Sequence, residues 1–405
     1  MNVVLARCAG LDVHKRSITA CAIIHGRKSI AEFGATTFEL LRLSDWLAEL
    51  EVTHVAMESA GVYWKPVFNL LEVAGFELLL VNARHMKAVP GRKTDIKDAE
   101  WIADLLRHGL LTASFVPRRE QRELRELTRH RRKLVEQRGR AANRIQHVLE
   151  GANIKLGDVA SNVLGVSGLA MLRALVEGGL TPAEMARLAR GRLRSKHAEL
   201  EAALTGVMSD HQRFLLASLL RQVDFHDQEI AALATEIEKR LESHDELVDR
   251  LDEIPGIGRA TAEHLIAEIT TDMSRFPTAK HLASWAKVCP GNHESGGKRL
   301  SGKTGKGSRW IRAILVEAAH AAARARGTYL GQMYQRIAAR RGKKRAAMAV
   351  AHAILVIVYH MISRGTRYQD LGVDHYDKQR EAQVVRNATR RIRTLGYHVT
   401  LQPVA

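Results

Sequence analysis

Apolar positions in the first 115 residues follow two periods in alternation. Short β-branched runs separated by polar turns open the chain, and SIAEF follows the second turn, which predicts a three-strand meander. Apolar residues then recur at helical spacing and give way again to short apolar runs. The predicted elements are strands at 3–13, 17–24, 54–57 and 76–81 and helices at 38–50, 62–74 and after Asp95. This alternation predicts an α/β domain with a mixed sheet over residues 1–115.

Residues 116–250 have a different pattern, typical of long basic helices. One helix is expected from about residue 117 to 151 and another from about His211 to Arg250, with an insert at about 152–208 that has turn signals. The first helix has an apolar seam with three-, four- and seven-residue spacing, interrupted by Arg131 and Arg138. The seam residues are Leu124, Leu127, Leu134, Ala141, Ile145 and Val148. The two helices are therefore predicted to form an antiparallel or intermolecular coiled coil.

A mainly helical region is predicted from 251 to 365, followed by a basic tail at 366–405. It opens with EIPGIGRATAEHLIAEI, the pattern of a helix, a tight hairpin and a second helix. The free N–H groups near Gly256 and Gly258 could hold a phosphate without reading sequence. A plain turn between helices explains the same residues equally well.

The charge balance favours a polyanionic partner. Lys and Arg number 62 against 44 Asp and Glu, so the net charge is +18 and the pI about 10.1. Between Ser295 and Asp370 the only acidic residue is Glu317, which favours nucleic-acid contact over a solvated basic face. We expect no membrane-spanning run and no signal peptide, hence a cytoplasmic, nucleoid-associated bacterial protein. The three cysteines lack disulfide or zinc spacing.

Four acids stand at positions where the predicted α/β layers converge. Asp12 follows the first strand in AGLDVHK, and Glu58 closes the strand in HVAMESAG. Asp95 and Asp98 lie three apart at the start of a helix, so they share a face. Carboxylates brought together repel unless hard cations lie among them, and Mg²⁺ prefers oxygen ligands. Each acid alone could instead be an N-cap or a solvated strand end.

A glycine-rich basic loop, CPGNHESGGKRLSGKTGKGSRW at 289–310, places Ser295 before two glycines. Glycine lets a backbone approach a phosphate closely, and lysines neutralise it, so this hydroxyl could attack a phosphodiester. Serine needs a base or metal to act as a nucleophile, and His293 and Glu294 are adjacent. The residues predicted to bind nucleic acid are Gly256, Gly258, Lys298, Arg299, Lys303, Lys306, Arg309 and Arg312.

Several motifs together resemble the insertion-sequence one-ten family of transposases. They are AGLDVHK, MESAGVYW, RKTDIKDA, IPGIG with RFPTAKHLASWAKVCPGNHESGG, and RLSGKTGKGSRWIRAIL, in that family's order. The resemblance implies a RuvC-like (RNase H-like) domain whose DEDD metal set falls on Asp12, Glu58, Asp95 and Asp98. It also implies a transposase domain with Ser295 as nucleophile.

The resemblance further implies how such a protein would act. The serine would attack a DNA phosphodiester and form a covalent phosphoserine, with two Mg²⁺ ions at a composite site. A guide (bridge) RNA would select donor and target DNA by base pairing, and dimers would assemble into a tetramer. The insert at 152–208 is longer than in compact members of the family, and Cys289 and Asn292 match no family role.

Two other functions fit the residues. In a metal-dependent junction endonuclease, water would attack at the four acids and Ser295 would be part of a loop only. In a non-catalytic nucleic-acid-binding protein, the acidic set would be degenerate. A protein–DNA adduct distinguishes the recombinase from the endonuclease, and loss of cleavage in Asp12→Ala distinguishes both from the binding protein.

Overall fold

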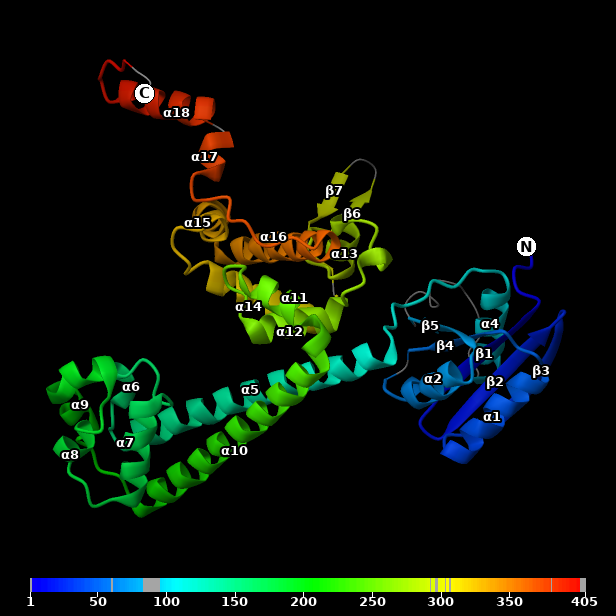
Figure 1. The fold of residues 1–405 in the computed structure, drawn as a ribbon, viewed down its shortest axis with the longest axis horizontal. Helices are drawn as coiled ribbons and strands as arrows, with labels where there is room; N and C mark the ends of the chain where they lie inside the picture. The colour runs from blue at the N-terminus through cyan, green and yellow to red at the C-terminus, as the bar shows by residue number, and fades with distance from the viewer. Residues whose placement is uncertain are drawn as a thin grey trace. The chain divides into compact units, whose positions relative to one another are not determined.

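The structure, a computed structural model, consists of two compact units, Met1–Arg119 and Glu120–Ala405. The first is an α/β unit and the second is almost wholly helical (Figure 1). At Asp95 and at the strand residues 293–295 and 298–301 the backbone alone is described. The described residues are 2–59, 61–82, 95–291, 293–295, 298–302, 304–305, 307–379 and 381–400.

A five-stranded mixed sheet forms the first unit, with strand order β3-β2-β1-β4-β5. The first three strands form the antiparallel meander that the alternating pattern predicts, and β4 and β5 add to β1 in parallel. The strands are β1 (Arg7–Val13), β2 (Ser17–Ile24), β3 (Arg27–Gly34), β4 (His54–Glu58) and β5 (Glu77–Val81).

Helices cover both faces of this sheet. α1 (Thr37–Glu49) and α2 (Trp64–Val73) pack on one face, and α4 (Asp95–Arg107) packs on the other. A Cβ at Gly10 of β1 would lie 2.4 Å from the backbone of α4, so glycine permits this close approach. Cys8 and Cys21 are buried free thiols on the α4 face, as expected, and burial raises the pKa of each to about 11.

The second unit is organised around two long antiparallel helices, α5 (Arg119–Gly151) and α10 (Asp210–Leu241) (Figure 1). Arg138 pairs with Asp227, and the Arg240 guanidinium lies 2.9 Å from a Glu123 carboxylate oxygen, so ion pairs join the helices at two levels. The apolar residues of the α5 seam are divided between two separate cores. The structure therefore does not confirm a continuous coiled coil.

The predicted continuous helix from His211 to Arg250 is wrong for residues 242–250. The α10 helix ends at Leu241, a short 3₁₀ turn follows, and α11 (Asp245–Asp252) begins in a new direction. The change of direction lets Leu247, Val248 and Leu251 enter a core, and this burial outweighs the helical continuity that the sequence suggests.

The insert forms a helical cap around one end of the α5–α10 pair (Figure 1). Its buried residues form one apolar core with Ile145 of α5 and Leu216 of α10. The elements are α6 (Leu156–Val159), α7 (Val166–Glu177), α8 (Pro182–Ala186), η1 (Gly191–Lys196) and α9 (His197–Leu204).

The other core is formed by the remaining helices up to α16, and the serine-bearing hairpin follows α13 in the chain. They are α12 (Arg259–Ile269), α13 (Ala279–Trp285), β6 (His293–Ser295), β7 (Lys298–Ser301), α14 (Arg309–Ala322), α15 (Tyr329–Arg341) and α16 (Lys343–Arg364).

The expectation that no apolar run reaches membrane-spanning length is wrong for α16. By length and composition alone, this helix is long and apolar enough to cross a membrane. Its buried residues, among them Val350, Ile354 and Leu355, belong to this core, as in a core helix. The predicted basic tail contains two helices, α17 (His375–Gln379) and α18 (Glu381–Thr394).

Candidate active site

Two of the predicted metal-binding acids lie next to each other on the sheet of the first unit. Strands β1 and β4 are parallel and paired up to Leu11 and Met57, so Asp12 and Glu58 are the next residues on adjoining strands. Side chains alternate along a strand, and Gly10 and Ala56 both lie against α4. Asp12 and Glu58 therefore share the α4 face at the carboxyl edge of the sheet.

The first turns of α4 bring the other two acids to this face. Asp98 directly precedes Ala99, whose carbonyl oxygen lies against Gly10, and it is partly buried. Asp95 is the first residue of α4, three positions earlier, and its side chain lies outside the described part of the structure. The fold thus brings the first turns of α4 to the face of the sheet on which Asp12 and Glu58 lie.

Asp12 is held in a nearly closed environment. Asp12 is 8% exposed, and one of its carboxylate oxygens lies 3.0 Å from Nε2 of His14, two residues further along the chain. Among the described side chains, no three of His, Cys, Asp and Glu are close enough together to hold a metal ion. The donors are hard oxygen ligands, so the type of the groups fits a divalent cation.

The predicted nucleophile lies on a two-stranded hairpin of the second unit. Ser295 ends β6, and its backbone pairs with that of Lys298 at the start of β7. The side chains of His293, Glu294, Ser295, Lys298 and Arg299 lie outside the described part, as do Lys303 and Lys306. The hairpin is a defined support for Ser295 rather than the open loop that the sequence also allowed.

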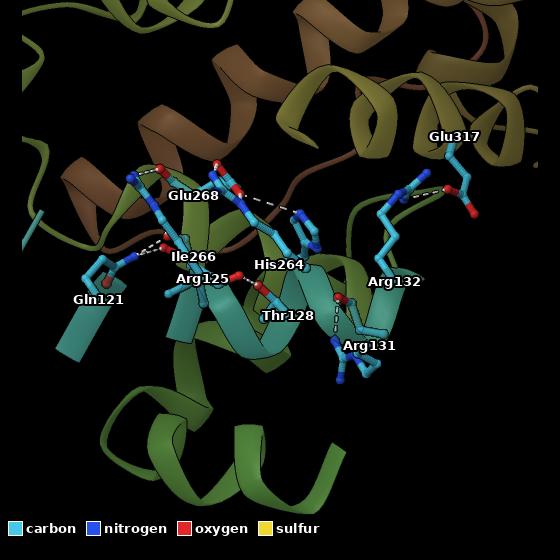
Figure 2. Close-up of polar contacts among 12 residues, drawn as sticks. Gln121, Arg125, Thr128, Arg131, Arg132, His264, Ile266, Glu268 and Glu317 are labelled. Carbon is cyan, nitrogen blue, oxygen red and sulfur yellow. Dashed lines mark hydrogen bonds and ion pairs between the residues drawn. The ribbon is translucent and has the colours of Figure 1, made fainter. Parts of the chain in front are cut away.

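The first half of α5 holds the end of α12 by polar contacts (Figure 2). The last carbonyls of a helix have no partner within it. Gln121 donates to the carbonyls of Ile266 and Ala267 at 2.6 and 2.5 Å, and Arg125 donates to Ala267 at 2.8 Å. These side chains satisfy the carboxyl end of α12 and fix α5 on the core.

Buried charges complete this contact. Arg129 forms a two-pronged pair with Glu268, at 2.6 and 2.9 Å, and Arg131 lies 2.6 Å from Glu263 (Figure 2). His264, between the two glutamates, is 2% exposed, and burial lowers its pKa to about 4, so the imidazole is neutral at pH 7. Arg131 interrupts the apolar seam of α5 because its partner is a carboxylate on another helix.

We expect Arg131→Met to destabilise the protein by about 3 kcal/mol, because it leaves Glu263 buried without its nearest guanidinium. Urea unfolding of the full chain, followed by circular dichroism, measures this change. The matched control is Arg132→Ala on the same helix, whose partner Glu317 is mostly exposed; a loss below about 1 kcal/mol is expected. Equal losses in the two variants would contradict a special role for the buried pair. The double variant Arg131→Met/Glu263→Leu should recover much of the loss.

Arg129 and Lys133 of α5 also reach the start of α14, which follows the hairpin. Trp310 has three cations near its ring, with Arg309 at 4.7 Å, Arg129 at 5.4 Å and Lys133 at 5.8 Å from the centroid. Cation–π contacts of this kind stabilise the position of the indole. Arg129 therefore links α12 to the first turn of α14. Sequence reasoning missed this role; the only signal was an arginine-rich helix.

The structure gives Gly256 a packing role. A Cβ there would lie 2.3 Å from the Ala318 carbonyl of α14, so the turn is glycine because α14 approaches it closely. Gly258 is exposed at the start of α12, but the next residue, Arg259, is surrounded by acids. They are Glu238, Asp245, Asp249 and Glu263. These carboxylates disfavour a phosphate at the start of α12, and the plain turn fits better.

Arg309 and Arg312 are two further residues that the sequence predicts to bind nucleic acid, and the structure describes their side chains. Arg309 is exposed and lies over Trp310. The guanidinium of Arg312 donates to the Gly305 carbonyl at 3.3 Å and so holds the segment between the hairpin and α14. Arg312 also lines a groove of about 1170 Å³ beside that segment.

Both parts of the chain match known transposase families. Residues 9–154 match a transposase family of the DEDD, IS110 type, and residues 248–335 match the Transposase IS116/IS110/IS902 family. These matches lie over the acidic corner and over the serine-bearing hairpin.

Similar proteins agree over most of the length. The Probable family 20 transposase of Pseudomonas aeruginosa is 26% identical over 81% of this chain and 89% of its own. The Transposase for insertion sequence element IS1111A of Coxiella burnetii is 24% identical over 89% and 90%. A Pilin gene-inverting protein of Moraxella bovis is 54% identical over 43 residues, 11% of this chain and 13% of its own.

The chain belongs to the IS110/IS116/IS902 family of transposases. It is an enzyme that transposes DNA of an insertion sequence, and its DEDD domain suggests the use of a divalent metal.

Proposed function

We propose that this transposase is a Mg²⁺-dependent recombinase that cuts and rejoins DNA strands through a covalent bond to Ser295. The observation that carries the proposal is the placement of Asp12 and Glu58 on one face of adjoining strands, with the start of α4 across the same face. A chain that used these acids only as solvated strand ends would have no need to bury Asp12. The mixed five-stranded sheet with helices on both faces supports the further proposal that the first unit is a RuvC-like (RNase H-like) domain.

Asp12, Glu58, Asp95 and Asp98 would hold the metal, as two ions in a composite site. When bound, Mg²⁺ polarises the phosphate and offsets the charge that develops on its oxygens. The residues of the chain have separate tasks. The four carboxylates would hold the cation, and the His14 imidazole near Asp12 would help to fix that carboxylate.

The Ser295 hydroxyl would attack the phosphorus of a DNA phosphodiester. A bond forms between the serine oxygen and phosphorus, the bond from phosphorus to the 3′ oxygen breaks, and the hydroxyl proton passes to a base while the 3′ oxygen leaves as a hydroxyl. The phosphoserine ester keeps the energy of the broken bond. A 3′ hydroxyl of the partner DNA can then attack the ester and reseal the strand.

Partners follow from the family. Donor and target DNA are the substrates, and a guide (bridge) RNA would choose both by base pairing. Two chains would associate through the exposed faces of α5 and α10 as an intermolecular coiled coil, and dimers would form a tetramer. The inverting activity named for the Moraxella relative also supports a cut-and-reseal reaction.

A trapped intermediate tests the proposal. We expect the protein, mixed with donor DNA and Mg²⁺, to form an adduct that survives denaturation, and mass spectrometry to find the nucleotide on Ser295. A hydrolytic nuclease makes no adduct. Efficient cleavage without any adduct, or an adduct on another residue, would contradict the serine mechanism.

A further inference from the structure

The groove of about 1170 Å³ beside the hairpin has a basic rim and an apolar floor. The three helices α14, α15 and α16 and the loop segments around β6 and β7 line it. Its cations are Arg312, Arg341, Lys344 and Arg345. Its apolar lining, called the floor below, includes Val288, Pro290, Met333, Ile337, Met348 and Ala349. Its volume exceeds the range of about 300–1,000 Å³ typical of small-molecule sites, which favours an extended ligand.

The rim cations are available to a ligand. Arg341, Lys344 and Arg345 are exposed, and none of them has an acidic partner among the described residues. Arginines elsewhere in this unit, such as Arg129 and Arg138, are paired with carboxylates. No acid lines the groove within the described part of the chain. This charge arrangement is complementary to a polyanion.

The side chains of α16 in the groove form one helical face. Arg345 lies three and four residues before Met348 and Ala349, and His352 follows these two at four and three residues. Burial lowers the pKa of His352, so its imidazole is neutral at pH 7 and adds no charge at depth. The groove is therefore positive at the rim and uncharged below.

We propose that this groove binds a single DNA strand, with its phosphates on Arg341, Lys344 and Arg345 and its sugars and unstacked bases against Met333, Ile337 and Met348. A duplex keeps its bases stacked inside and could use only the rim. A single strand can bring apolar base faces to the floor as well. The inference rests on the proposed function, because the groove lies beside the segment that carries Ser295, and the bound strand would be the one that is cut.

Binding of a labelled 12-nucleotide oligodeoxythymidine tests the groove. The protein is the full chain freed of copurified nucleic acid, carrying Ser295→Ala so that no chemistry occurs. Adding Arg341→Ala, Lys344→Ala and Arg345→Ala should flatten the slope of log affinity against log salt by about 2, since each single-strand phosphate contact contributes about 0.7. Between 50 and 200 mM salt the parent should then lose about 16-fold more affinity than the triple variant.

The matched control removes three exposed cations from η1, in the helical cap of the same unit. The substitutions are Arg192→Ala, Arg194→Ala and Lys196→Ala. It should leave the slope nearly unchanged. An equal effect in the control would overturn the proposal, since net charge alone would then explain binding. A 12-base-pair duplex and a 12-nucleotide RNA are tested in the same way. If either one binds more tightly than the DNA strand, and the triple variant loses the same affinity for it, the proposal is also overturned.

Position is tested by cross-linking. An oligonucleotide containing 4-thiothymidine should attach to peptides that hold Met333, Met348 or His352; attachment only elsewhere would overturn the proposal. The binding readout does not depend on the serine chemistry. If wild-type protein forms no adduct yet the triple variant loses the strand, the proposed function fails and the groove stands. If the adduct forms and the triple variant binds normally, the groove fails.

Discussion

Replacing Ser295 with alanine should lower strand exchange by about 10³-fold or more while leaving DNA binding nearly intact. Alanine lacks the oxygen that forms the phosphoserine ester, so no energy-conserving intermediate can arise. Exchange is measured as joined donor–target product per unit time, and binding by gel shift at the same salt concentration.

Ser301→Ala is the matched control for this prediction. Ser301 ends the paired strand β7 and its backbone lies opposite His293 in the same hairpin, so the substitution tests the hairpin without the nucleophile. It should retain most of the activity. Joined products from Ser295→Ala at more than a tenth of the wild-type rate would show that another group attacks the phosphate.

Asp12→Asn should lower strand cleavage by about 10³-fold, again with binding largely retained. The change keeps the size of the side chain and removes a buried charge beside His14. Loss of several kcal/mol of electrostatic stabilisation at the phosphate corresponds to roughly this factor. Cleavage of labelled donor DNA over a range of Mg²⁺ concentrations measures the effect.

The control for the acidic corner is Glu77→Gln, at the opposite end of the sheet. Glu77 is the exposed first residue of β5 and pairs with His54, whereas Glu58 pairs with Val81 at the carboxyl edge. Cleavage should be unchanged in this variant. If Asp12→Asn cleaved as fast as Glu77→Gln, the acids would not form the catalytic set, and a non-catalytic role would be favoured.

The sequence predicts the first unit well because its local signals agree with its tertiary packing. The β-branched runs around Ala9 and Ala20 become the central strands β1 and β2, where Asp12 is the last residue but one of β1 and Glu58 ends β4. Their shared face follows from the register, which the sequence implies only through the strand boundaries. The hydrophobic periodicity of the sequence does not predict the side-chain distances among the four acids.

Long-range contacts in the second unit were not predictable in the same way. Nothing local marks the break after Leu241, because it is the core that takes in Val248 and Leu251. Arg131 reads as an interruption of a seam until Glu263, 132 residues away, is seen beside it. The sequence identifies the apolar seam of α5, but the residues that pack against this seam belong to two separate cores.

The groove shows a different limit. The basic run near Arg341 is obvious in the sequence, and it predicts a polyanionic partner. That Arg312 lines the same groove as Met333 and Met348 depends on how α14, α15 and α16 pack together. Sequence reasoning therefore identified the kind of ligand and missed the shape of the site.

The central claim is that the acids of the first unit and the hydroxyl of the second act on the same phosphorus atom. The most direct test is the rate at which DNA becomes attached to Ser295 in the Asp12→Asn protein, followed by denaturing gel and mass spectrometry. The account predicts that attachment falls by about 10³-fold, as cleavage does. Attachment to Ser295 at the wild-type rate without the Asp12 carboxylate would contradict it.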